Sequence, residues 1–414
     1  MGYRGLFTVA VAAMLVTTAV GSSRLITPAM VQEQYHSTDV ATGLCAVSVL
    51  IHGYKCQEFT VETKDGYILS VQRIPEGRAG GGAAAGAVPK QPVLLQHGFL
   101  VDGSSWVLNS PEESLPMILA DNGFDVWIVN TRGTAYSRRH VSLDTRQQKY
   151  WDWSWDEIAA YDLPAAIDFV YTTTGKHKIN YVGHSLGTLV ALTSLSERNQ
   201  IDKLRSASLL SPIAYLSHMK TGLGNIAARS LLSEAYKILG IAEFDPLGYP
   251  VKEFVRLICA KPGISCFDLI AAITGKNCCL NTSSIDLYIK SEPQPTATKN
   301  VIHLAQTVRS GILSKYDYGN ALSNIVHYGQ FSPPIYNLAN IPHNFPLFLS
   351  YGGNDYLSDT EDVNNLLHTL RDHDRDKITV HYVPNYGHVD FVLGLTAKDV
   401  VFNQVVAFLN NPVF

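Results

Sequence analysis

The 414-residue sequence has little charge and does not gather it by sign. Only 16% of residues are charged, and the 32 Lys and Arg are interspersed with the 36 Asp and Glu. A nucleic-acid site needs a basic patch to neutralise phosphates, so this pattern excludes nucleic acid as a partner. Because 46% of the residues are hydrophobic, the chain can bury a large core and we expect a folded globular protein.

Long hydrophobic runs are scarce as well. One apolar stretch opens the chain, from Leu6 to Val20, behind the single cation Arg4 and ahead of small residues. This pattern predicts a signal peptide at residues 1–22. An uncleaved anchor is the alternative, but about 15 residues fall short of the roughly 20 that span hydrocarbon. No later run reaches about 18 residues, so we expect the mature chain to be soluble or peripheral.

Cysteine occurs six times and never in a CxxC spacing, so no metal centre is expected. The even number suits an oxidising compartment, and the sequon Asn281-Thr282-Ser283 predicts glycosylation of Asn281 in the secretory pathway. The grouping predicts one bridge near the start and one cluster later: Cys45 and Cys56, then Cys259, Cys266, Cys278 and Cys279. Adjacent Cys278 and Cys279 are not expected to bond each other, because disulfide geometry disfavours it.

Short apolar runs alternate with helical patterns along the first half of the chain. Asp65-Gly66 between two alternating stretches predicts a β-hairpin. Residues 79–88 are Gly/Ala-rich and read as a loop; a phosphate-binding loop is the alternative, but no Lys-Ser/Thr follows. Strands are predicted at 92–96, 124–130, 178–183 and 206–213, with a helix over 156–173. This order predicts an α/β fold with a mostly parallel, buried sheet.

The strand rhythm stops between about residues 215 and 340, where the apolar spacing becomes helical. It resumes at 345–353 and 378–384, and a last amphipathic helix is predicted near 399–409. We therefore expect a core made of residues 45–214 and 341–414, interrupted by a mainly helical cap at 215–340.

The strongest chemical motif is Gly183-His184-Ser185-Leu186-Gly187, which fits G-x-S-x-G between a predicted strand and a predicted helix. Glycines flank the serine because side chains there would collide with the neighbouring strand and helix. The interpretation is a nucleophile at Ser185; a simple glycine-rich turn is the alternative. The amide of Leu186 then becomes one oxyanion donor.

A serine nucleophile needs a histidine base and a carboxylate that orients it. Asp355 and His388 follow the two late strands, in the chain order that α/β-hydrolases use. Asp359 and Asp390 are rivals for the acid, and His184 and His97 for the base, but none of them combines that order with a position directly at a strand end. The predicted triad is Ser185, Asp355 and His388.

The second oxyanion donor is expected after the early strand, where His97-Gly98-Phe99 supplies the amide of Phe99. A plain turn capped by the histidine is the alternative. Two other clusters have simpler explanations. Residues 150–157, YWDWSWDE, resemble a sugar-binding platform but favour helix capping and packing. Residues 371–376, RDHDRD, contain metal-binding residue types but favour a charged turn.

Several stretches between residues 45 and 410 resemble the acid lipase family, which includes gastric lipase, lysosomal acid lipase and secreted plant lipases. They are LLQHGFL, NTRGTAYSRRH, YVGHSLGT, SEPQPTATKNVIHLAQ, YGGNDYLSD and YGHVDF; HGYKCQEF, RIPEGR and GKNCCLN are most similar to the plant members. The resemblance implies an α/β-hydrolase fold with a mobile cap. It places the family's nucleophile, acid and base on Ser185, Asp355 and His388, and its oxyanion amides on Phe99 and Leu186.

The sequence departs from the family at three points: the Gly/Ala-rich insertion, Leu186 where gastric lipase has Gln, and cap cysteines unlike those of the animal enzymes. The first two leave the chemistry intact, while the third leaves cap disulfides and chain-length preference open. We expect a secreted serine esterase acting on triacylglycerol or steryl-ester lipids without a cofactor or an obligate protein partner, and touching lipid surfaces transiently through the cap. An acyltransferase with the same triad, a catalytically silent binding protein and a serine carboxypeptidase are the alternatives.

Overall fold

The computed structural model describes residues 43–78, 90–229, 238, 240–245 and 266–411. Residues Leu44–Phe414 form one compact unit. The expected signal peptide, the Gly/Ala-rich stretch and Cys259 lie outside the described residues. Within the described ranges, no helix is both long and apolar enough to cross a membrane.

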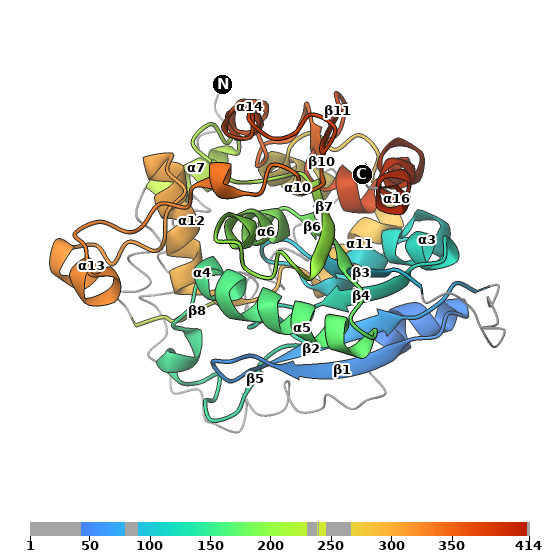
Figure 1. Ribbon diagram of the computed structural model, residues 1–414, viewed down its shortest axis with the longest axis horizontal. Helices are drawn as coiled ribbons and strands as arrows, with labels where there is room; N and C mark the ends of the chain where they lie inside the picture. The colour runs from blue at the N-terminus through green and yellow to red at the C-terminus, as the bar shows by residue number, and fades with distance from the viewer. Residues whose placement is uncertain (1–42, 79–89, 230–237, 239, 246–265, 412–414) are drawn as a thin grey trace. The chain divides into compact units, whose positions relative to one another are not determined.

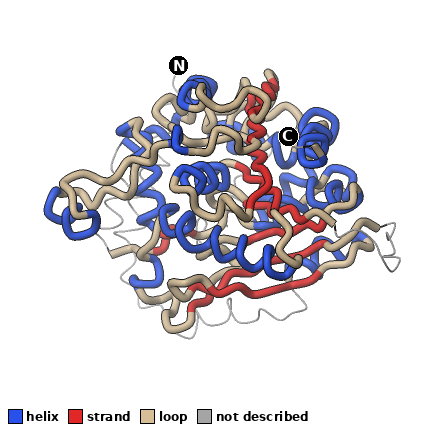
Figure 2. The backbone as a smooth tube through the Cα atoms, viewed as in Figure 1, coloured by secondary structure: helices blue, strands red, loops and turns tan. Residues whose placement is uncertain are grey.

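A nine-stranded sheet forms the centre of this unit, in the order β1-β2-β4-β3-β6-β7-β10-β11 with β5 beside β2 (Figures 1 and 2). All neighbours from β4 to β11 run parallel, whereas β1 and β2 form an antiparallel hairpin at one edge. The strands are β1 Gln57–Glu62, β2 Tyr67–Ile74, β3 Pro92–Gln96, β4 Asp125–Val129, β5 Arg139–His140, β6 Ile179–His184, β7 Leu204–Leu210, β10 Leu347–Gly352 and β11 Ile378–Val383. The hairpin and the parallel sheet predicted from the sequence are both confirmed.

Helices cover both faces of the sheet, as a buried parallel sheet requires. One core cluster packs helices α5 and α6 against the sheet, and a second packs α3 and α16 against the other side. The central strands β3, β4 and β6 are buried at every position, so both of their faces contact apolar side chains. The helices that flank the sheet are α3 Leu115–Asp121, α4 Trp155–Glu157, α5 Leu163–Thr173, α6 Leu186–Ser196, α14 Thr360–Thr369, α15 Asp390–Leu393 and α16 Asn403–Asn410.

The tryptophan-rich residues 150–157 begin the α4–α5 helical region. Ser154 caps α4 through a capping box with Glu157, and Trp151, Trp153 and Trp155 are buried in the core. A π-helical turn, Ile158–Asp162, joins α4 to α5. The interpretation of this motif as a cap with packing aromatics is therefore confirmed, and its rings are not available as a platform.

The stretch between residues 215 and 340 is mainly helical where it is described. Its helices are α7 Gly222–Arg229, α10 Cys266–Thr274, α11 Thr282–Ser291, α12 Thr298–Ser310 and α13 Ala321–Tyr328. A two-stranded sheet of β8 Glu243–Phe244 and β9 Thr296–Ala297 also forms there, which the helical spacing did not predict.

The disulfides give one confirmation and one correction. Cys45 and Cys56 are bonded, as their proximity in the sequence predicted. Cys278 and Cys279 also bond each other, so the expectation that neighbours would not pair was wrong. Their Cα atoms are 3.7 Å apart, closer than in ordinary disulfides, but the two side chains turn to the same side of the shared peptide and close a small ring.

Candidate active site

Ser185 lies on the sharp turn between β6 and α6. Its φ of 53° and ψ of −117° are a conformation that non-glycine residues rarely adopt. The turn is held by the sheet itself, because the Ser185 amide donates to the Leu210 carbonyl of β7 at 3.1 Å. A Cβ on Gly187 would come within 2.6 Å of the Gln96 carbonyl of β3. The flanking glycine is therefore required by close backbone contact, as the motif predicted.

Asp355 and His388 meet across the loops that follow β10 and β11. The Nδ1 of His388 lies 3.0 Å and 2.9 Å from the two carboxylate oxygens of Asp355. Both side chains are buried. This pairing fixes the imidazole so that Nδ1 carries the proton and Nε2 is free to accept one.

The Asp355 carboxylate is strongly solvated by the protein. Burial alone would raise its pKa, but the charge and hydrogen bond of His388, with the amides of Leu357 and Ser358 at 2.9 Å and 2.8 Å, outweigh burial. The pKa of Asp355 is therefore held below its usual range. The group stays ionised and can stabilise an imidazolium.

His184, the residue before Ser185, contacts His388. Its ring centre lies 4.8 Å from that of His388, and its Nε2 donates to the His388 carbonyl at 3.0 Å. Burial and the neighbouring His388 lower the pKa of His184 to about 3, so it remains neutral. Within the described residues, no hydrogen bond joins Ser185 Oγ to His388. Such contacts are often long in a free enzyme and tighten with substrate.

The two expected oxyanion donors border the serine. Leu186 is the first residue of α6, where an amide has no partner inside the helix. The loop of Gly98 and Phe99 lies directly against the nucleophile, since a Cβ on Gly98 would come within 3.0 Å of Ser185 Cβ. The N-terminal end of α6 and the Gly98 loop thus both lie beside Ser185.

His97 fixes this loop instead of acting as a base. Its Nδ1 donates to the Gly98 carbonyl at 2.9 Å, and its Nε2 accepts from the Thr131 amide at 3.1 Å. Burial lowers its pKa to about 4, which matches the neutral tautomer that these two bonds require. The histidine therefore holds the loop that borders Ser185.

The rival acids have other partners. Asp359 caps α14 by accepting from the Glu361 amide at 2.9 Å, and it pairs with Lys220 at 2.6 Å. In the part of the chain that the structure describes, the hydrogen bonds that Asp390 accepts all come from backbone amides. His373 of the charged turn is buried, with its Nε2 2.7 Å from the Phe345 carbonyl. Among the described residues, neither aspartate contacts the ring of His388.

Within the described ranges, one cluster of three ligand-type side chains occurs, Cys278, Cys279 and Asp390. Its two sulfur atoms are bonded to each other and offer no thiolate ligands. The cluster instead connects its two cysteines to the His388 loop, because Asp390 accepts from the amides of Cys278, Cys279 and Gly387.

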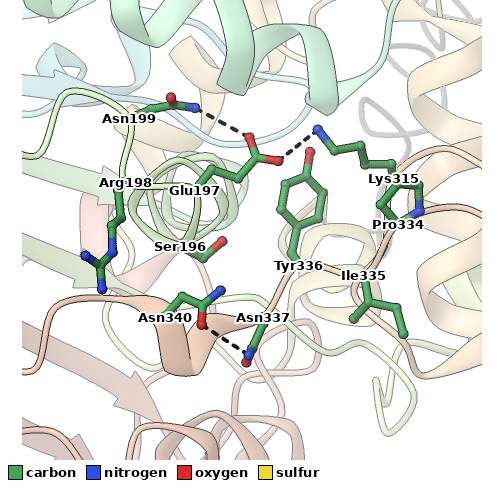
Figure 3. A pocket seen from close by; sticks show the side chains of 10 residues that line it. All are labelled: Ser196, Glu197, Arg198, Asn199, Lys315, Pro334, Ile335, Tyr336, Asn337 and Asn340. Carbon is green, nitrogen blue, oxygen red and sulfur yellow. Dashed lines mark hydrogen bonds and ion pairs between the residues drawn. The ribbon is translucent and has the colours of Figure 1, made fainter. Parts of the chain in front are cut away.

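A polar surface pocket of about 730 Å³ lies at the end of α6 (Figure 3). Glu197 pairs there with Lys315 at 2.8 Å, and the lining residues are Ser196, Glu197, Arg198, Asn199, Lys315, Pro334, Ile335, Tyr336, Asn337 and Asn340. Because α6 begins beside Ser185 and ends at Ser196, this pocket is at the opposite end of the helix from the nucleophile. It is not the space that the triad faces.

One contact set was not anticipated from the sequence. Residues 274–279, between α10 and α11, lie against the loops that carry Asp355 and His388. No local pattern marks such a segment, because its partners are roughly 80 to 110 residues further along the chain.

The fold, with a serine turn between a parallel strand and a helix and with Asp and His after the last two strands, places the chain in the α/β-hydrolase class. A family model described as the alpha/beta hydrolase fold matches residues 91–235, and one described as a partial alpha/beta-hydrolase lipase region matches residues 47–110. Solved structures agree in fold. Monoglyceride lipase from Saccharomyces cerevisiae is 15% identical, with 88% of this chain and 99% of that chain covered and a TM-score of 0.51.

Relatives in sequence define the family more narrowly. Triacylglycerol lipase 2 of Arabidopsis thaliana is 57% identical, covering 89% of this chain and 88% of the relative. Human lysosomal acid lipase/cholesteryl ester hydrolase is 35% identical over 86% of this chain and 87% of its own length. Human gastric triacylglycerol lipase is 34% identical over 86% of this chain and 88% of its own length. The chain belongs to the acid lipase family.

Proposed function

We propose that the protein is a secreted serine lipase that hydrolyses carboxylic esters of lipids, of the triacylglycerol or steryl-ester type. Ser185 is the nucleophile, His388 the general base and Asp355 the orienting acid. The amides of Phe99 and Leu186 form the oxyanion hole. The observation that carries the proposal is the buried pairing of His388 Nδ1 with Asp355 beside the strained turn of Ser185.

The reaction has two halves. His388 Nε2 takes the Ser185 hydroxyl proton while Oγ attacks the ester carbonyl, and the negative oxygen is stabilised by the Phe99 and Leu186 amides. The imidazolium, paired with Asp355, then gives its proton to the leaving alcohol, and an acyl-enzyme remains. Water, deprotonated by the same imidazole, attacks the acyl-enzyme, and the imidazolium returns the proton to Ser185 Oγ as the fatty acid is released.

Lipid as the substrate class is supported by the family relatives, which carry triacylglycerol and cholesteryl ester names. In this proposal residues 215–340 are a cap over the site that meets the lipid surface transiently. Residues 1–22 direct the chain to the secretory pathway, and Asn281 carries a glycan. Asn281 is half-buried at the start of α11, where its Oδ1 accepts from the Ser283 amide.

The test is labelling with a fluorophosphonate, which reacts only with an activated serine, followed by mass spectrometry of the labelled peptide. Soluble short-chain and emulsified long-chain esters are assayed in parallel with Ser185→Ala. Ser194→Ala is the matched control, because Ser194 is a buried serine of the same helix.

We expect the label on Ser185, cleavage of long acyl esters and loss of more than about 10³-fold of the activity in Ser185→Ala. The Ser194 variant should keep wild-type rates. Activity retained by Ser185→Ala would exclude this nucleophile. Folded wild-type protein that takes no label would indicate the silent binding protein.

A further inference from the structure

The 274–279 segment meets the acid loop through its backbone. Gly275 forms an antiparallel bridge with Asp355, and the Tyr356 amide donates to the Thr274 carbonyl at 3.4 Å. Gly275 has a φ of 99°, and a Cβ there would come within 1.9 Å of the Asn354 carbonyl. The segment is therefore packed against this loop as closely as two backbones allow.

The same segment meets the base loop. The amide of His388 itself donates to the Thr274 carbonyl at 3.0 Å, and the next amide, Val389, donates to Asn277 Oδ1 at 3.0 Å. The Asn277 side chain is held in turn, since its Nδ2 donates to Thr274 Oγ1 at 2.8 Å and to the Gly275 carbonyl at 3.1 Å. Two successive amides of the histidine loop are thus bound by this segment.

Asp390 adds the second attachment. One carboxylate oxygen accepts from the amides of Gly387 at 2.8 Å and Cys278 at 3.0 Å, and the other accepts from Cys279 at 3.1 Å. Asp390 is fully buried, so these three amides provide the solvation that water would otherwise give. The carboxylate therefore ties the residue before His388 to the vicinal cysteines.

The disulfide between Cys278 and Cys279 restricts the peptide that joins the two residues, which carries the Cys279 amide. A bond between neighbouring side chains closes a small ring around their shared peptide, which leaves its backbone few orientations. In the orientation observed, both amides point to Asp390. The bridge thus preorganises a backbone site for the carboxylate that follows His388.

We infer that Asn277 and Asp390 are positioning residues, which together with the Cys278–Cys279 bridge hold the His388 and Asp355 loops at the spacing that catalysis requires. The inference rests on the proposed function of Ser185, Asp355 and His388. Neither residue contacts substrate in this account. They act through His388, whose misplacement by about 1 Å can lower the rate about 100-fold.

The experiment compares Asn277→Ala with Asn324→Ala. Asn324 is also buried, its Oδ1 accepts the Tyr318 amide at 3.1 Å, and its Nδ2 donates to Asp317 and the Phe331 carbonyl. It makes the same kinds of hydrogen bond as Asn277, but with none of the triad loops. Both variants are assayed for thermal midpoint, for kcat and KM on a soluble ester, and for the rate of fluorophosphonate labelling.

We expect the two variants to lose similar stability. Only Asn277→Ala should lower kcat and the labelling rate, by about 10- to 100-fold, with KM within about two-fold of wild type. Equal kcat and equal labelling in the two folded variants would overturn the inference. Wild-type labelling at Ser185 shows separately whether the proposed nucleophile holds, so the two failures are distinguishable.

A second pair of variants decides the case if Asn277→Ala does not fold. Cys278→Ser with Cys279→Ser removes the vicinal bridge and keeps both amides, and Cys45→Ser with Cys56→Ser removes the other bridge. We expect the first to lower kcat and labelling several-fold and the second to lower only the thermal midpoint. A first variant with wild-type kcat would count against the bridge, and Asp390→Asn with wild-type kcat would count against the carboxylate.

Discussion

The two ends of the predicted triad are held in different ways. At the nucleophile end, Ser185 is fixed by its own sheet: its amide bonds to β7, and Gly187 touches the backbone of β3. At the acid and base end, Asp355 and His388 lie on loops after the last two strands and are braced by the 274–279 segment, which belongs to neither strand. The first end is held by the sheet and the helix that follows it, and the second also contacts residues 274–279.

This difference separates what local geometry provides from what tertiary contact provides. A strand, a tight turn and a helix of consecutive residues present the serine, and the neighbouring strands β3 and β7 of the same sheet hold the turn. The spacing of an acid and a base on separate loops depends on whatever binds those loops from outside. Substitutions at the two ends should therefore affect kcat and stability in different ways.

The largest effect is expected for Asp355→Asn. An amide at this position reverses the favoured tautomer of His388, so kcat should fall about 10⁴-fold while the fold persists. Soluble-ester kinetics and the thermal midpoint measure the two quantities. Asp359→Asn is the control from the same loop; asparagine keeps the acceptor that caps α14 and removes only the charge that pairs with Lys220, so stability should fall by no more than about 1 kcal/mol with little change in kcat. A larger loss of kcat in the Asp359 variant would reassign the acid.

The nucleophile end should respond to Gly187→Ala. The new Cβ would press on the Gln96 carbonyl, so strand β3 or the turn must shift, at about 1–3 kcal/mol of stability and about 10- to 100-fold in kcat. Urea unfolding and ester kinetics give both values. Gly222→Ala, at the start of α7, meets no atom within 4 Å and should leave kcat unchanged while raising stability by no more than about 1 kcal/mol. Wild-type kcat in Gly187→Ala would mean that the sheet does not set the position of the serine.

The smallest effect on activity is expected at Asp156, a buried carboxyl bonded to the Tyr336 hydroxyl and the Tyr316 amide, away from the triad loops. Burial, opposed by these bonds, raises its pKa to about 6. Because the folded pKa exceeds the unfolded one, its contribution to stability is full below about pH 4 and is lost as the pH rises through about 6.

Asp156→Asn removes this titration. The free energy of unfolding of wild type minus variant should therefore fall by up to about 3 kcal/mol between pH 4 and pH 7. Urea unfolding at several pH values measures it, and kcat at each pH should match wild type. A difference in the free energy of unfolding that does not vary with pH would contradict the raised pKa of Asp156. An altered kcat would mean that the contacts of Asp156 also help to position the loops of Asp355 and His388.

Much of the sheet was accessible from the sequence because each element depends on its neighbours in the chain. Strand β3 spans Pro92–Gln96 as predicted, and the serine turn follows β6 as the glycines required. The bridge of Cys278 to Cys279 was wrongly excluded, because the usual Cα spacing does not describe a ring closed across one peptide. Asn277 gave no signal, since its partner Val389 is 112 residues away.

Asp390 shows a second limit of prediction from the sequence. Its place two residues after a histidine made it a rival catalytic acid, and only the three amides around it reveal a different use. A carboxylate that serves a reaction and one that anchors backbone carry the same letter in the sequence. Their partners in space distinguish them.

The backbone of Ser185 has a consequence for how such a protein can change. A left-handed conformation at a residue with a side chain costs about 1–3 kcal/mol, and it is sustained by packing on both sides of the turn. A glycine would rest there without that cost, but it has no hydroxyl. In the proposed function the hydroxyl of Ser185 is the nucleophile, so a substitution that relieves the backbone strain and stabilises the fold would also abolish the activity.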